Sequence, residues 1–142
     1  MSDNSKEVVL PSGAMLLMNM ATITAAFTLN DVVLKTLMAT GRTSADPTSL
    51  DPESIIALVS SEGVREAVFK CAEKAVYLAG GKGSAAQRIT MSLFDDQAIG
   101  AQIRGDYFDL VAAVINFNTV PFYQARISAS KVPTQTGPKN PQ

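Results

Sequence analysis

The stretch RGDYFDLVAAVINFNTVPFYQ, from Arg104 to Gln124, carries the strongest information about the fold. Its apolar residues recur at intervals of three and four, which predicts an amphipathic helix. Asn118 followed by Pro121 predicts the start of a further helix. The stretch also holds more than half of the rings in a chain with three Tyr, six Phe and no Trp. We expect three of these rings to be core residues and two, whose tips are polar, to suit an interface. The expected core rings are Phe108, Phe117 and Phe122, and the expected interface rings are Tyr107 and Tyr123.

Three further helices are predicted upstream of this stretch. Apolar residues at helical spacing predict a helix over residues 23–40 and another from residue 64 to Leu78. Residues 52–60 open with a proline, which is favoured in the first helical turn, and predict a short helix between them. The last helical region, which includes the helix of the opening stretch, is expected to begin near Asp95 or Asp96. In total, four to five helices are expected.

Strand signals are few. Residues 7–20 contain two apolar runs around Pro11 and Gly13, which predicts a short β-hairpin. Residues 89–93 could form an extended piece. The predicted fold is therefore mainly α: a small helical domain with a short N-terminal β-hairpin.

The domain boundaries follow from length and composition. The chain has 142 residues, which is enough for one domain. We expect a flexible N-terminus at residues 1–6, one domain over residues 7–130, and a disordered tail at residues 131–142, where Pro, Gly and polar residues dominate.

The composition excludes several classes of function. The net charge of −1 and the pI near 5.3 argue against nucleic-acid binding. There is no His, and Cys71 is the only cysteine, so we expect no catalytic residue, no metal site and no cofactor, and hence no enzyme. Asp106 and Asp109 are expected to be solvent-exposed or to cap a helix. No apolar run is long enough to span a membrane and no signal peptide is visible, so a cytoplasmic location is expected.

Five segments occur in an order and spacing that resemble a known family. They are VLPSGA near the N-terminus, FKCAEKAVY in the middle, and then ITMSLFDD, RGDYFDLVAAVINFN and PFYQ. Together, over about residues 8–125, they resemble the tail assembly chaperones of long-tailed bacteriophages. Residues 41–51 match nothing in that family's pattern, and the segment AGGKGSAAQR is longer than the turn expected there.

The resemblance implies a non-enzymatic role in the cytoplasm of an infected host cell. Such chaperones bind the tape measure protein, keep this long helical rod soluble, recruit subunits of the major tail protein, and are absent from the mature virion. Self-association of the chaperone is a further expectation. The family also implies a longer form made by ribosomal frameshifting, with which residues 138–140 are compatible. The alternative is a virion structural protein, either a head–tail connector or a tail terminator.

A holdase for a helical rod needs adaptable apolar surface. Flexible methionine side chains can supply it, or they can fill an ordinary core, and both readings stay open from the residues alone. The candidate surface for a partner or for self-association consists of Met15, Met18, Met20, Tyr107 and Tyr123.

Overall fold

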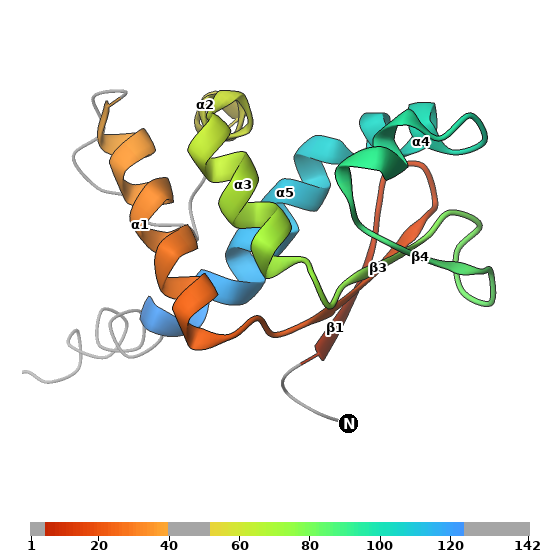
Figure 1. The fold of residues 1–142 in the computed structure, drawn as a ribbon, viewed down its shortest axis with the longest axis horizontal. Coiled ribbons are helices and arrows are strands. Elements are labelled where there is room, and N and C mark those ends of the chain that lie inside the picture. The colour runs from red at the N-terminus through yellow and green to blue at the C-terminus, as the bar shows by residue number, and fades with distance from the viewer. Residues whose placement is uncertain (1–4, 40–51, 124–142) are drawn as a thin grey trace, which may run out of the picture.

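The computed structural model describes residues 5–39 and 52–123. The four strands form one antiparallel sheet in the order β1-β2-β3-β4. The fold is therefore α+β, and the prediction of a mainly α domain with only a short hairpin is wrong. In chain order the elements are β1 (Ser5–Val9), β2 (Met15–Asn19), α1 (Ile23–Ala39), α2 (Pro52–Ser60), α3 (Glu62–Cys71), β3 (Val76–Leu78), β4 (Ala86–Arg88), the 3-10 helix η2 (Met91–Asp95), α4 (Gly100–Gly105), α5 (Tyr107–Thr119) and the 3-10 helix η3 (Val120–Tyr123) (Figure 1).

The N-terminal hairpin is confirmed as β1 and β2, although it begins at Ser5, two residues before the predicted start. Its turn is closed by Leu10 N, which donates to Ala14 O at 2.8 Å, and by Gly13 N, which donates to Leu10 O at 2.9 Å. Gly13 has a φ of 92°, a conformation that glycine adopts without the steric cost of a side chain. The turn therefore forms where the Pro-Ser-Gly sequence predicts it.

One face of the sheet forms a wall of the hydrophobic core. The strand register places Val8, Leu16 and Tyr77 side by side on neighbouring strands, and all three pack in the core. Successive residues of a strand point to opposite faces. On the other face Val9 is 70% exposed. The helices therefore cover one side of the sheet.

The second half of the sheet replaces the end of a predicted helix. The helix predicted to reach Leu78 ends at Cys71, where Ala72 N donates to Val68 O at 2.9 Å. The next residues form β3, which pairs with β2 on one side and β4 on the other. Val76 and Tyr77 belong to the residue types that favour strands, and the pairing partners outweigh the helical spacing of the apolar residues.

The extended piece predicted at residues 89–93 is also displaced. The strand β4 ends at Arg88, and the residues from Met91 onward form η2 instead. Ile89, between them, is buried. The prediction therefore placed an extended segment in this region but assigned it to the wrong residues.

Helix α5 is the central helix of the domain. Figure 1 shows it in blue, behind α3 and beside α1, and it contacts α1, α2, α3 and α4. Its side chains at Leu110, Val111, Val114 and Ile115 are at most 1% exposed. The stretch from Arg104 to Gln124 thus contains the helix around which the other helices pack.

The aromatic residues of this stretch are placed differently from the prediction. Phe117 is partly buried and packs against the core, as expected. Phe108 and Phe122 are 48% and 37% exposed, so the prediction that they are core residues is wrong. Aliphatic side chains fill the buried arc of α5, and Phe108 lies beyond its edge.

Asn118 lies inside α5 and does not cap a new helix, contrary to the prediction. It is 4% exposed. Its Oδ1 accepts a hydrogen bond from Ala21 N at 3.0 Å, and its Nδ2 donates to Val114 O at 2.9 Å. The side chain therefore ties the link between β2 and α1 to the central helix.

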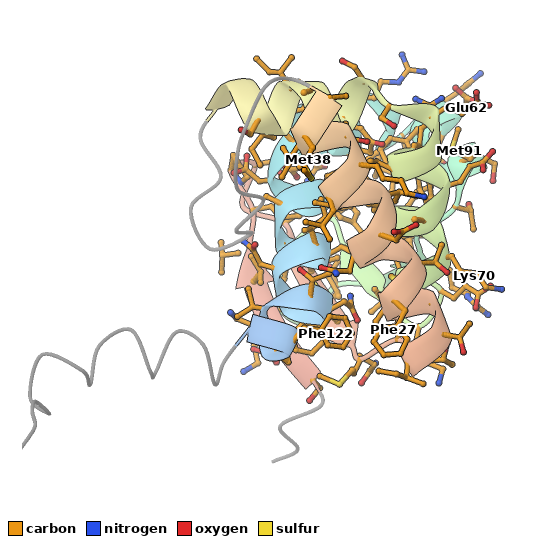
Figure 2. The ribbon with its side chains drawn as sticks, turned by 90° about the vertical axis from the view of Figure 1, so that its left-hand side faces the viewer. Phe27, Met38, Glu62, Lys70, Met91 and Phe122 are labelled. Atoms are coloured by element: carbon orange, nitrogen blue, oxygen red, sulfur yellow. The ribbon has the colours of Figure 1, made fainter. Side chains whose placement is uncertain are left out.

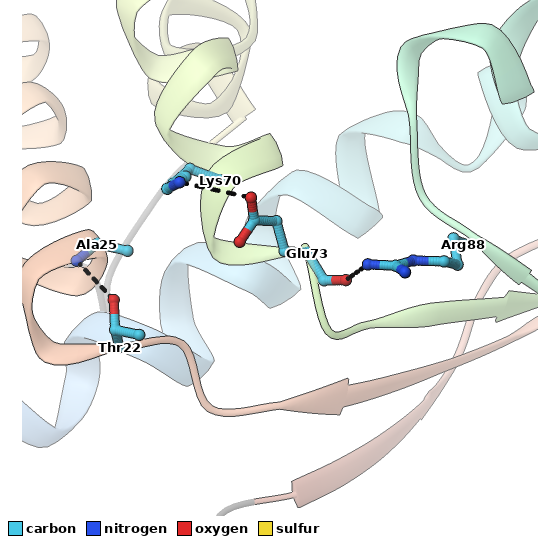
Figure 3. Close-up of polar contacts among 5 residues, drawn as sticks. All are labelled: Thr22, Ala25, Lys70, Glu73 and Arg88. Atoms are coloured by element: carbon cyan, nitrogen blue, oxygen red, sulfur yellow. Dashed lines mark hydrogen bonds and ion pairs between the residues drawn. The ribbon is translucent and has the colours of Figure 1, made fainter.

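Polar contacts at the surface define the ends of several elements (Figure 3). Thr22 Oγ1 accepts from Ala25 N at 3.2 Å and caps the start of α1. Arg88 Nη2 donates to Glu73 O at 3.0 Å and joins β4 to the segment that follows α3. Lys70 forms an ion pair with Glu73 at 3.5 Å near the end of α3.

Some predictions concern residues outside the described part of the chain. The flexible N-terminus predicted at residues 1–6 is described only from Ser5, and the tail predicted at residues 131–142 is not described. Within the described ranges, no helix combines the length and apolar character needed to cross a membrane.

Candidate functional site

Asp106 connects three segments that are far apart in the sequence. It is the residue between α4 and α5, and it is 1% exposed. Its Oδ1 accepts from Ser12 N at 3.0 Å, and its Oδ2 accepts from Ser12 Oγ at 2.5 Å and from Tyr77 OH at 2.7 Å. Ser12 belongs to VLPSGA, Tyr77 ends FKCAEKAVY, and Asp106 belongs to RGDYF. The three segments therefore meet at one carboxylate.

The expectation that Asp106 is solvent-exposed or caps a helix is wrong. Its side chain makes no capping hydrogen bond to α5, because the hairpin turn and the sheet supply its donors. Gln102 extends the network, since its Nε2 donates to Ser12 Oγ at 3.2 Å and to Ala79 O at 2.7 Å. Sequence spacing could not find this cluster, because Ser12 and Asp106 are 94 residues apart.

The Ser12–Tyr77–Asp106 cluster is suited to a structural role, because its hydrogen bonds join the hairpin turn and β3 to the start of α5. We call this cluster the buried clamp. Burial, together with the hydrogen bond to Asp106, raises the pKa of Tyr77 to about 12, so the phenol stays protonated and acts as a donor. Among the described residues, no group of His, Cys, Asp and Glu is arranged to hold a metal ion. Cys71, which the sequence predicts to be buried, is 2% exposed, and burial raises its pKa to about 11. Its thiol is thus held in the unreactive protonated form.

The described residues of the predicted surface differ in their burial. Met15 and Met20 are half-buried, whereas Met18 is 3% exposed and belongs to the core. Tyr107 is half-buried at the start of α5. Tyr123 lies in η3, and its side chain is outside the described part of the structure. As a core residue, Met18 is not available for contact with a partner.

A row of exposed apolar side chains lies instead on α1. Ile23, Phe27 and Met38 are 59%, 57% and 57% exposed, and Leu34 is half-buried. At 100° per residue these four positions fall within an arc of about 60°, and at 1.5 Å per residue they span about 22 Å. We call these four residues the α1 stripe. Figure 2, which views α1 from the outside, shows Phe27 near one end of the helix and Met38 near the other.

Phe122 extends the α1 stripe sideways. Its ring stacks on Phe27 with a centroid separation of 5.1 Å and an interplanar angle of 24° (Figure 2). On the other side the stripe is flanked by an exposed ion pair, in which Lys35 Nζ and Asp31 Oδ2 lie 3.0 Å apart. The surface therefore combines a broad apolar ridge with charges of both signs along one margin.

The sequence carries a signal for this surface, although the prediction did not use it. The apolar positions of residues 23–40 include both the buried residues, such as Leu29 and Val33, and the exposed ones, such as Phe27. They occupy a wider arc than one contact with a core requires. An apolar arc that is wider than packing on the core requires therefore indicates that the helix has a second apolar contact.

A second apolar feature is a pocket between α3, η2, α4 and α5, with a volume of about 220 Å³. Phe94 lies edge-on to both Phe69 and Tyr107, with centroid separations of 5.8 and 5.4 Å. We call this the aromatic pocket. Its lining residues are Arg65, Phe69, Met91, Phe94, Arg104 and Tyr107.

Two polar side chains that line the aromatic pocket, Arg104 and Tyr107, differ in whether their polar atoms have hydrogen-bond partners. Arg104 Nη2 pairs with Asp95 Oδ1 at 2.9 Å, and its Nε donates to Phe94 O at 2.9 Å. The buried hydroxyl of Tyr107 has no hydrogen-bond partner among the described residues. Burial raises the pKa of Tyr107, and the positive charge of Arg65 acts in the opposite direction. Tyr107 therefore contributes its ring to the pocket, and its hydroxyl stays buried behind that ring.

Comparisons of the chain with protein-family models, with curated proteins and with solved structures found no match.

Proposed function

We propose that this protein is a tail assembly chaperone of a long-tailed bacteriophage. In this role it binds the tape measure protein in the host cytoplasm, keeps it soluble, recruits major tail protein subunits and leaves before the virion is complete. It acts by binding and release, without catalysis. The proposal combines the resemblance of the five segments with a single structural observation, the exposed α1 stripe.

The α1 stripe supports this role because of its length and chemistry. Large apolar side chains exposed in a row are unfavourable in water and typically mark a site for another protein. A straight stripe of about 22 Å is suited to an amphipathic helix, which buries its own apolar face along such a ridge. A tape measure protein, as a long helical rod with apolar stripes, has many such faces. Copies bound along one rod would also gain avidity.

Co-expression tests the proposal. With the chain present, the cognate tape measure protein should appear mainly in the soluble fraction, and without it mainly in the pellet. An unchanged soluble fraction would refute the holdase role.

The alternative role, a connector or tail terminator, differs in its final location. A chaperone should be missing from purified virions analysed by mass spectrometry. Recovery of the chain at a stoichiometry typical of a ring would favour the structural alternative and contradict the proposal.

A further inference from the structure

The aromatic pocket has the composition of a recognition site, and the α1 stripe does not include it. Three rings and Met91 supply apolar walls, and Arg65 and Arg104 supply positive charge. Met91 is 59% exposed at the margin of the pocket. Such a mixture of apolar walls with a few convergent polar groups is typical of ligand sites.

The size of the pocket limits what it can hold. Small-molecule sites usually measure about 300–1,000 Å³, so 220 Å³ is small for a cofactor. An engineered cavity of about 150 Å³ is large enough for benzene. One phenylalanine- or leucine-sized side chain therefore fits the aromatic pocket.

The charged residues that line the pocket indicate which chemical group would lie next to the bound side chain. Arg104 is already paired with Asp95, whereas Arg65 forms no ion pair among the described residues. The Tyr107 hydroxyl has no hydrogen-bond partner among the described residues, but it is fully buried and is not accessible to a ligand in the pocket. A carboxylate beside the apolar side chain would pair with Arg65.

The surroundings favour a polypeptide as the occupant. A second hollow of about 410 Å³ shares Arg65, Phe69 and Met91 with the aromatic pocket and adds Glu62 and Glu66. Figure 2 shows Glu62 and Met91 at the same end of the molecule. A chain that continues beyond its anchored side chain would run into this acidic margin along α3, where a cationic residue is favoured.

We propose that the aromatic pocket binds a segment of a partner polypeptide through one aromatic or leucine-sized side chain adjacent to a carboxylate. The inference rests on the proposed function only in taking a polypeptide as the occupant. It concerns a surface separate from the α1 stripe, so the two can fail independently.

Methionine methyl NMR tests the inference on the purified full-length chain. The probes are two blocked dipeptides, acetyl-Phe-Glu-amide and its neutral counterpart acetyl-Phe-Gln-amide. Met91 and Met38 are 59% and 57% exposed, so they report the pocket and an equally exposed control site on α1 (Figure 2). We expect saturable shifts of the Met91 methyl signal with the acidic peptide, little change at Met38, and weaker binding of the neutral peptide.

Three substitutions test how individual polar side chains in and near the pocket contribute to peptide binding. Arg65→Gln should weaken binding of the acidic peptide roughly threefold to fivefold, as expected for a partly exposed charge pair. Lys70→Gln removes a positive charge from the same helix outside the pocket and should leave binding unchanged. Tyr107→Phe should leave binding unchanged, because the ring still lines the pocket and the hydroxyl is not accessible from it.

The inference would be overturned by any of three results. The first is the absence of a saturable Met91 shift, and the second is an equal shift at Met38, which would indicate non-specific apolar contact. The third is equal affinity of the two peptides for the chain, or undiminished binding to the Arg65→Gln variant, which would remove the role of the carboxylate. None of these results would change the soluble fraction measured by co-expression, so failure here is distinguishable from failure of the proposed function.

Discussion

The Tyr77→Phe substitution tests the buried clamp, because it deletes one hydroxyl and keeps the ring. Tyr77 is 0% exposed, and its hydroxyl donates to Asp106 Oδ2 at 2.7 Å. A hydrogen bond to a charged group contributes about 1.5–3 kcal/mol, so we expect a loss of roughly 2 kcal/mol in the free energy of unfolding. In urea this corresponds to a midpoint lowered by about 1 M, at a typical dependence of about 2 kcal/mol per M. The melting temperature should fall by roughly 4–8 °C.

Tyr107→Phe is the matched control for this measurement. It deletes the same atom from a buried hydroxyl that has no hydrogen-bond partner among the described residues. Because no bond is lost, the free energy of unfolding should change by less than about 0.5 kcal/mol, or rise. Chemical denaturation of the three proteins, followed by circular dichroism, gives both differences. Equal destabilisation by the two substitutions would refute the reasoning, since it would show that the hydrogen bond to Asp106 is not what stabilises the fold.

Three further predictions concern the side chain of Asn118, the thiol of Cys71 and the titration of Tyr77. Asn118→Ala should lower the free energy of unfolding by roughly 1–3 kcal/mol, because Ala21 N loses its acceptor, and urea denaturation measures the loss. The Cys71 thiol, 2% exposed with a pKa raised to about 11, should react with a thiol reagent at pH 8 only after unfolding, and rapid labelling of the folded chain would contradict its burial. Tyr77 has a folded-state pKa raised from 10.0 to about 12, so the folded state binds this proton more tightly than the unfolded state. Its contribution to stability should therefore be complete below pH 10 and be lost as the pH rises towards 12, and the urea midpoint of Tyr77→Phe should depend less on pH in that window.

Local signals in the sequence were sufficient for part of the fold. The hairpin turn requires a residue that accepts positive φ, and Gly13 supplies it next to Pro11. Helix α1 is found where its apolar period of three to four residues predicts it, and α2 begins at Pro52, where the proline predicts its first turn. These elements are specified by residues close to one another in the chain, which is why a single sequence reveals them.

The rest of the sheet depends on partners that are distant in the chain. The strand β3 has three residues and lies within an apolar pattern that also fits a helix. It becomes a strand because β2, about sixty residues earlier, offers unpaired backbone groups, with Leu16 opposite Tyr77. The burial of Asp106 has the same origin, since its donors come from the hairpin turn and from β3. No local pattern distinguishes such a carboxylate from a helix cap.

The candidate surface was only partly accessible from the sequence. Tyr107 was selected because a phenol combines an apolar ring with a polar tip, and the structure places it in the lining of the aromatic pocket. Met18 was proposed because methionine side chains are flexible, but the strand register of the hairpin places its side chain in the core. Phe27 was treated as part of a helical stripe, and its exposure depends on which arc of α1 the other helices cover.

The central claim is that the α1 stripe holds a partner helix, and paired substitutions test it directly. Phe27→Ala and Phe108→Ala remove the same side chain at 57% and 48% exposure, from α1 and from α5. Each variant is co-expressed with the cognate tape measure protein, and the soluble fraction of that protein is measured. We predict that Phe27→Ala lowers the soluble fraction well below that obtained with the unsubstituted chain and that Phe108→Ala leaves it unchanged. A soluble fraction that is the same for Phe27→Ala as for the unsubstituted chain, with both variants folded, would contradict the account.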